Sequence, residues 1–188
     1  LLAYVATSGS GVLQLYLRAM DSLEARPLAG TENATGPFFS PDGQWIGFSA
    51  GDKLKKVSVS GGATLTLSDV LAFRGASWGP NDTIVFAPAS NGGLLQVSAA
   101  GGAPLPLTKL KQGESSHRWP QFLPGGKTVL FTVLTEGNLD NSEIAAQGLD
   151  SAEHKVLIRG GTFGRYVPTG HLVYYRAGTM MAVPFDPV

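Results

Sequence analysis

The sequence has no cysteine among its 188 residues, and this absence excludes disulfide frameworks, zinc ribbons and thiol nucleophiles. It also has no surplus of charge, because 14 basic side chains balance 14 acidic ones. A nucleic-acid-binding protein needs a basic surplus or stripe to displace counterions from phosphate, so we expect no nucleic-acid partner. No apolar run approaches the roughly 18 residues of a membrane span, and we expect no membrane insertion.

Glycine and proline are abundant, with 25 and 12 residues, while 43% of the residues are hydrophobic and only 15% are charged. Glycine and proline spread evenly through an apolar chain are typical of many short strands joined by tight turns. The composition therefore predicts an all-β domain and does not indicate a function.

A hairpin with a proline turn recurs four times along the chain. The segment FFSPDGQWIGF (38–48) places a Pro-Asp-Gly turn between two aromatic-bearing strands, and related segments lie at 77–86, 121–131 and 165–174. The turn prolines are spaced 39, 44 and 44 residues apart. They are Pro41, Pro80, Pro124 and Pro168, with Phe39, Trp78, Phe122 and Tyr166 two residues before them and Phe48, Phe86, Phe131 and Tyr174 six or seven residues after them.

A second hairpin follows each proline turn. Segments 55–67 and 95–107 match at an offset of 40 residues, and the pairs Gly61–Gly62 and Gly101–Gly102 supply the positive φ of a two-residue turn. Four strands in about 40 to 45 residues are the signature of a β-propeller blade. We expect the repeated aromatic side chains to lie between blades, where their rings bury the most area.

We therefore predict one β-propeller repeat array over residues 1–188. Complete four-stranded blades are expected at 34–72, 73–115 and 116–161, with partial blades at 1–33 and 162–188. Incomplete end blades have unpaired edge strands. This pattern favours a fragment of a longer propeller; the alternatives are a five-bladed ring with defective end blades and a half-ring completed by homodimerisation.

The segment FSPDGQWIGF (Phe39–Phe48) resembles the signature of the TolB-type, WD-like β-propeller repeat family, which centres on Ser-Pro-Asp-Gly. The resemblance covers nearly the whole chain, although the later turns depart from Asp-Gly. Related repeats occur in periplasmic TolB-type proteins and in propellers that precede α/β-hydrolase peptidases. The phrases RGASWG and HRWPQFLPGGK are most similar to extracytoplasmic propeller regions of bacterial Ser/Thr kinases. The resemblance implies an extracytoplasmic or periplasmic location. The repeat pattern and the absence of an assembled catalytic constellation favour a non-catalytic module whose loop face binds a protein, peptide or glycan.

Two long loops, 108–119 and 133–143, belong to the same repeat, and long loops in a terse array are commonly functional. Arg74 and Arg118 stand six residues before a turn proline, at the expected mouth of the central channel. Bidentate hydrogen bonds from these arginines would suit a carboxylate or phosphate. The alternative is structural pairing of each arginine with carbonyls or acidic groups of a neighbouring blade. The candidate ligand-binding residues are Arg74, His117, Arg118, Trp119, Glu136 and Asp140.

The sequence favours neither a metal nor a cofactor. The acidic loop offers oxygen ligands such as Glu136 and Asp140 but lacks the ordered spacing of a calcium loop. No pair of histidines has the spacing of zinc ligands. We therefore expect no bound metal and no cofactor.

One enzyme motif is present. Residues 47–51, GFSAG, match the G-x-S-x-G nucleophile elbow of serine hydrolases, with Ser49 as nucleophile. The candidate bases are His117, His154 and His171. The elbow needs a helix after its strand, whereas KLKKVSV (53–59) is typical of a strand. A serine hydrolase of the esterase type therefore remains an alternative to the binding module. A third hypothesis is a self-assembling structural propeller.

Overall fold

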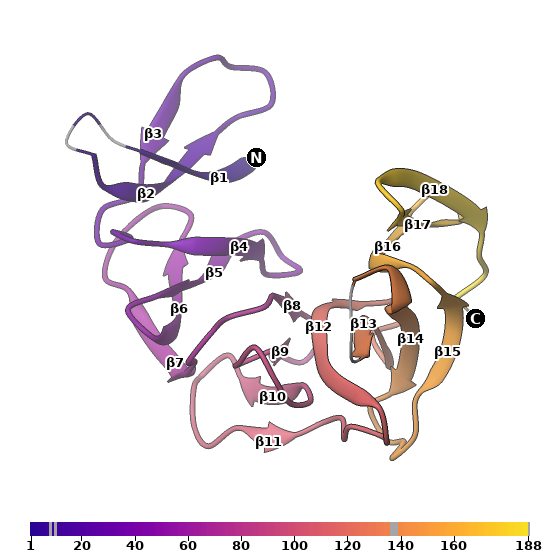
Figure 1. Ribbon diagram of the computed structural model, residues 1–188. Coiled ribbons are helices and arrows are strands. Elements are labelled where there is room, and N and C mark those ends of the chain that lie inside the picture. The colour runs from indigo at the N-terminus through magenta and orange to yellow at the C-terminus, as the bar shows by residue number, and fades with distance from the viewer. Residues whose placement is uncertain (8, 10, 136–138, 188) are drawn as a thin grey trace.

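The computed structural model describes residues 1–7, 9, 11–135 and 139–187. These residues form five small antiparallel sheets arranged around a common axis (Figure 1). Each sheet is a meander in which consecutive strands pair, and the described part of the chain contains only one short helix, the 3-10 turn η1 (Leu139–Asn141). The predicted all-β propeller is confirmed.

We call the sheets the first to fifth blades in chain order. The first blade contains β1 (Leu2–Thr7), β2 (Leu13–Arg18) and β3 (Ala25–Pro27). The second contains β4 (Thr35–Phe39), β5 (Trp45–Ala50), β6 (Lys53–Ser58) and β7 (Leu65–Asp69). The third contains β8 (Ala76–Trp78), β9 (Thr83–Phe86), β10 (Leu95–Ser98) and β11 (Leu105–Pro106). The fourth contains β12 (Glu114–Phe122), β13 (Thr128–Thr135), β14 (Glu143–Gly148) and β15 (Lys155–Arg159), and the fifth contains β16 (Thr162–Val167), β17 (His171–Arg176) and β18 (Thr179–Pro184).

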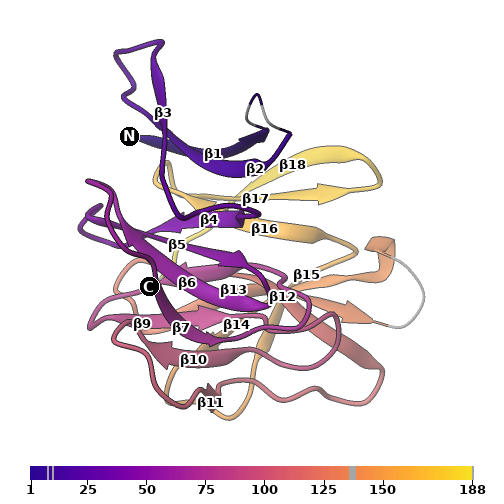
Figure 2. The ribbon, with the colours of Figure 1, turned by 90° about the vertical axis from the view of Figure 1, so that its left-hand side faces the viewer.

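The blades are arranged so that β4, β8, β12 and β16 face the common axis and β7, β11 and β15 lie at the periphery of an open arc (Figure 1). Figure 2, turned by 90°, shows most strands running lengthwise along the axis. The inner strands of neighbouring blades contact one another, β4 with β8 and β8 with β12. Side chains of the inner strands from different blades are therefore brought together at the axis.

Apolar layers between successive blades hold the propeller together. Four buried clusters lie between the first and second, second and third, third and fourth, and fourth and fifth blades. Each contains the two aromatic residues that flank one proline turn, as the repeat predicts. In chain order the pairs are Phe39 and Phe48, Trp78 and Phe86, Phe122 and Phe131, and Tyr166 and Tyr174.

The turn at Pro41 is stabilised by its own polar side chains. The Ser40 hydroxyl donates to Asp42 Oδ1 at 2.5 Å and accepts from the Trp45 amide at 2.9 Å. The Gln44 amide also donates to Asp42 Oδ1, at 3.0 Å. The hydrogen bond from Ser40 and then that from Gln44 lower the pKa of Asp42 below its ordinary value. Because these donors prefer the ionised carboxylate, the turn is more stable when Asp42 is charged.

We predict that Phe86→Ala lowers the free energy of unfolding by about 3–5 kcal/mol, because it leaves a cavity in the layer between the second and third blades. The Phe86 side chain is fully buried in that layer. Urea unfolding followed by circular dichroism measures the change. Leu71→Ala is the control, since Leu71 is 83% exposed; equal losses in the two variants would contradict the role of the layer.

We also predict that the stability difference between wild type and Asp42→Asn is present at neutral pH and shrinks as the pH falls below about 4. The asparagine keeps an oxygen acceptor but has no charge. Since the folded-state pKa of Asp42 is lowered, its contribution is complete above the pKa of the unfolded chain and is lost as the pH falls through the folded-state pKa. Urea midpoints between pH 3 and 7 test this, with Asp21→Asn as a surface-charge control. A difference that does not change with pH would contradict it.

Candidate functional site

The inner strands share a kink at the same repeat position. The residue five places before each turn proline has a positive φ: 57° at Gly36, 101° at Gly75, 52° at Trp119 and 56° at Phe163. The strand pairing shifts register around three of them, between 35 and 38, 118 and 121, and 162 and 165. Such bulges redirect side chains. Here they turn a short stretch of each inner strand toward the axis.

Two of these four positions carry large aromatic side chains. A left-handed backbone costs a residue with a Cβ atom roughly 1–2 kcal/mol, so Trp119 and Phe163 are held under strain. Their rings meet edge to face with centroids 5.4 Å apart. The glycines leave room for neighbouring rings: a Cβ atom at Gly75 would lie 3.0 Å from Trp119 Cα, and one at Gly36 would lie 2.6 Å from the Phe73 ring.

A groove of about 360 Å³ opens at this place. The rings of Phe73, Trp119 and Phe163 line it together with the side chains of Arg74 and Arg165. Phe163 is 40% exposed. The groove therefore combines accessible aromatic surface with two guanidinium groups and lies where the inner strands β4, β8, β12 and β16 converge.

Arg165 is the most deeply placed cation of the groove. Its Nη1 donates to the carbonyl oxygens of Trp119 at 2.7 Å and Gly164 at 3.0 Å, and its guanidinium carbon lies 4.4 Å from the centre of the Phe163 ring. Burial lowers the pKa of Arg165 to about 10, so the group stays charged at neutral pH. No acidic side chain within the described ranges pairs with it. The hydrogen bonds leave Nε and Nη2 as donors for a ligand.

Arg74 and Arg118 lie next to each other and are also paired with neutral groups. Arg74 donates from Nη1 to Phe73 O at 3.1 Å, while Arg118 donates to Ser116 Oγ and to Ser90 O, both at 2.7 Å. Burial, followed by repulsion from Arg74, lowers the pKa of Arg118. Backbone carbonyl oxygens accept hydrogen bonds from both arginines. The alternative of structural pairing with carbonyl groups therefore holds in part. Across residues 1–135 and 139–187, as far as these are described, neither forms an ion pair.

The residues predicted from the sequence fall in three places. Arg74 and Trp119 line the groove, and Arg118 stands beside Arg74. His117 is buried between blades and points away from solvent. Glu136 and the side chain of Asp140 lie outside the described part of the chain.

Sequence reasoning missed Phe73, Phe163 and Arg165. A signal for Phe163 exists, because it stands five residues before Pro168, as Trp119 stands five residues before Pro124. The predicted binding residues include Trp119 but not its repeat counterpart Phe163. No comparable signal marks Arg165, whose counterparts in the other repeats are Phe38, Ser77 and Gln121.

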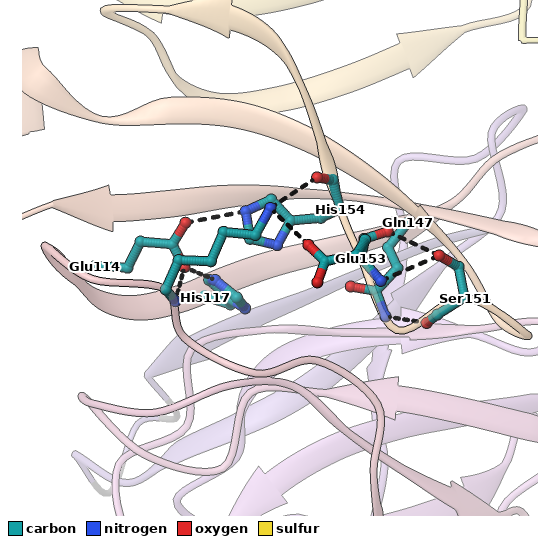
Figure 3. A network of polar contacts seen from close by, with 7 residues as sticks. Glu114, His117, Gln147, Ser151, Glu153 and His154 are labelled. Atoms are coloured by element: carbon teal, nitrogen blue, oxygen red, sulfur yellow. Dashed lines mark hydrogen bonds and ion pairs between the residues drawn. The ribbon is translucent and has the colours of Figure 1, made fainter.

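A second polar cluster is buried where the third and fourth blades meet (Figure 3). The carboxylate of Glu114 accepts hydrogen bonds from His117 Nε2 at 3.0 Å, from His154 Nε2 at 2.9 Å and from the Lys111 amide at 2.7 Å. Burial opposes ionisation of Glu114, but the hydrogen bonds from Lys111 and His117 outweigh it and lower the pKa of this carboxyl group. Burial also lowers the pKa of His117, so its imidazole is neutral at pH 7.

Ser49 lies inside strand β5 and is 7% exposed. Gly51 and Asp52 follow it with φ of 58° and 57°, a tight turn that leads directly into β6. The motif is therefore in a strand–turn–strand hairpin, as the sequence around residue 53 predicts, and not before a helix. The hydrogen bonds of His117 join it to Glu114 and Thr108, that of His154 goes to Glu114 and those of His171 to Thr169. The described residues thus give Ser49 no histidine partner.

Known structures share this fold. The chain superimposes on TolB from Acinetobacter baumannii with a TM-score of 0.70 at 16% identity, covering 98% of this chain and 51% of that one. It matches a putative TolB from Agrobacterium tumefaciens with a TM-score of 0.72 at 17% identity, covering 94% and 71%. For an oligogalacturonate lyase in complex with manganese the TM-score is 0.73 at 16% identity, covering 99% and 59%. The chain thus spans about half the length of the first TolB structure.

These likenesses define the class of protein, a β-propeller with TolB-type structural neighbours. No family model matches the sequence, and a search of the curated proteins finds no relative. In the described ranges there is no helix long and apolar enough to cross a bilayer. Because one of these neighbours is named as an enzyme and others are not, the fold alone does not assign an activity.

We predict that Gly75→Ala destabilises the protein by roughly 1–3 kcal/mol, because the alanine would adopt a strained φ and its Cβ atom would press on the Trp119 backbone. The matched control is Gly148→Ala, since Gly148 has no positive φ and its nearest neighbour would lie 3.8 Å from a Cβ atom. Urea midpoints of both variants are compared. A neutral Gly75→Ala would show that the backbone at the groove is not constrained.

Proposed function

We propose that this protein is a non-catalytic binding module that holds a carboxylate-bearing ligand in the groove at the propeller axis. The single observation that supports it most is Arg165, a desolvated guanidinium without an acidic partner among the described residues, placed over the exposed ring of Phe163. Burying a cation without a counter-charge is unfavourable, and an anionic ligand would offset that cost.

The composition of the groove favours an acidic peptide segment as the ligand. Arginines bind carboxylates through paired N–H donors, and aromatic rings pack against the apolar parts of a peptide. Phe163 and Trp119 supply such rings beside Arg165 and Arg74. One structural neighbour is the nidogen–laminin complex, with a TM-score of 0.71 at 17% identity, covering 95% of this chain and 72% of that chain. A protein partner fits the proposal. A glycan that carries carboxylate groups would offer the same chemistry to the arginines.

The resemblance of the repeats to TolB-type proteins and to the propeller regions of bacterial Ser/Thr kinases supports an extracytoplasmic or periplasmic location for this module. Homodimerisation through the end blades stays a prediction, and light scattering across protein concentrations tests it. Neither inference is needed for binding in the groove.

Tryptophan fluorescence tests the proposal, because Trp119 lines the groove. We expect peptides rich in glutamate and phenylalanine to bind, and their amide counterparts, with glutamine for glutamate, to bind poorly. Arg165→Gln should weaken binding roughly tenfold to a hundredfold, since a hydrogen bond to a charged group contributes about 1.5–3 kcal/mol. Binding should also weaken as ionic strength rises.

Arg159→Gln is the matched control, because Arg159 lies on the outer strand β15 with its side chain 83% exposed. Equal binding by wild type and Arg165→Gln would overturn the proposed ligand class. Labelling by a fluorophosphonate that is lost in Ser49→Ala would instead contradict the non-catalytic assignment and favour the hydrolase.

A further inference from the structure

The buried cluster of Glu114, His117 and His154 lies away from the groove, between the third and fourth blades. The side chains of His117, His154 and Glu114 are 0%, 2% and 8% exposed. Glu114 begins strand β12, His117 follows within it, and His154 immediately precedes β15. Figure 3 shows the two imidazole rings converging on one carboxylate. The fold thus joins two histidines that are 37 positions apart in the sequence.

The spacing of the three side chains suits a shared ion. One ligand atom from each lies within 4.8 Å of the others, and the two histidine–carboxylate pairs are separated by 3.0 and 2.9 Å. Ligands bound about 2.0–2.2 Å from one divalent ion, at tetrahedral to octahedral angles, lie about 2.8–3.6 Å apart. The two histidine–carboxylate distances lie in this range, whereas the ligand atoms that are farthest apart, within 4.8 Å, would have to approach by roughly 1 Å to share an ion.

The surroundings of His117 provide the outer partner that a metal-bound imidazole requires. Thr108 Oγ1 lies 2.7 Å from His117 Nδ1. A hydroxyl group can donate or accept, so it can accept a proton from Nδ1 when Nε2 is engaged by a metal. The neutral imidazole then only changes tautomer.

We propose that Glu114, His117 and His154 form a binding site for a divalent transition-metal ion, with Zn²⁺ as its representative. Two imidazole nitrogens and one carboxylate oxygen form a ligand set that zinc and its neighbours accept, whereas calcium and magnesium prefer oxygen alone. No signal in the sequence predicts this site, because neither the spacing of the histidines nor a local motif joins residue 117 with residue 154.

The charge of Lys111 predicts the direction in which a substitution there changes the metal affinity. Its Nζ donates to His154 O at 3.1 Å and lies 3.1 Å from Glu153 Oε2, and its charge acts on His117. This ammonium group repels any cation bound in the cluster. Lys111→Met removes the charge but leaves the Lys111 amide, which donates to Glu114, in place. The substitution should therefore strengthen metal binding.

The test uses ZnCl2, with affinity measured by competition against a chromogenic chelator and stoichiometry by equilibrium dialysis. We expect one Zn²⁺ per wild-type chain, binding weakened at least about tenfold in His154→Ala, and binding severalfold tighter in Lys111→Met. The control is His171→Ala, because His171 hydrogen-bonds only with Thr169 among the described residues. It should bind Zn²⁺ like the wild type.

A second measurement separates loss of the site from loss of the fold. Co²⁺ added to the wild type should produce a visible ligand-field band that is absent in Glu114→Gln, while circular dichroism confirms that this variant is folded. Absence of Zn²⁺ binding in the wild type, or equal affinity in wild type and His154→Ala, would overturn the proposal. Weaker binding in Lys111→Met would also contradict the assigned location.

Discussion

Burial of aromatic rings between neighbouring sheets is the interaction on which the rest of this structure depends. A sheet of three or four short strands has two apolar faces and cannot cover either by itself. Each of the four inter-blade clusters combines apolar side chains from two successive blades. At about 25 cal/mol per Å² and some 150 Å² for a ring, one buried phenylalanine contributes roughly 4 kcal/mol. An isolated pair of short antiparallel strands is at best marginally stable in water. The blades therefore depend on the burial of these rings between them.

Stacking in a ring has a consequence at the axis. The inner strands of adjacent blades approach one another there, and the space for side chains is limited. The repeated left-handed residue meets this limit in two ways: Gly36 and Gly75 leave room, whereas Trp119 and Phe163 fill it. Because glycines occupy this position in two blades and aromatic residues in the next two, the side chains along the axis fill the space unevenly. The groove therefore results from the packing of the inner strands, and charged side chains line it.

How far the sequence predicts this molecule depends on the range of the signal. Proline turns, glycine pairs and flanking aromatics are local, and they predicted the strands and the inter-blade rings, including β6 where a helix would have favoured a hydrolase. Prediction of the groove requires knowing which bulge residue of one blade faces a bulge residue of the neighbouring blade. Arg74 was placed by repeat position and Trp119 by the long loop that it ends, but Phe73 and Arg165 were not predicted, because their counterparts in other repeats differ. The Glu114 cluster joins the start of β12 with the residue before β15, from the two edges of one sheet, and no spacing along the chain indicates this contact.

Comparison of the repeats within this chain distinguishes scaffold from additions. Three residues before their turn prolines, Ser77 and Gln121 hydrogen-bond to the backbone of the next inner strand, at Phe122 and Tyr166. Arg165 occupies the same place but turns back to Trp119 O. The second, third and fourth blades form without a charge at this position, so the propeller does not require one there. A chain with no net charge can thus have a cationic groove. The local field at the axis depends on a few arginines that form no ion pair among the described residues, and not on the net charge.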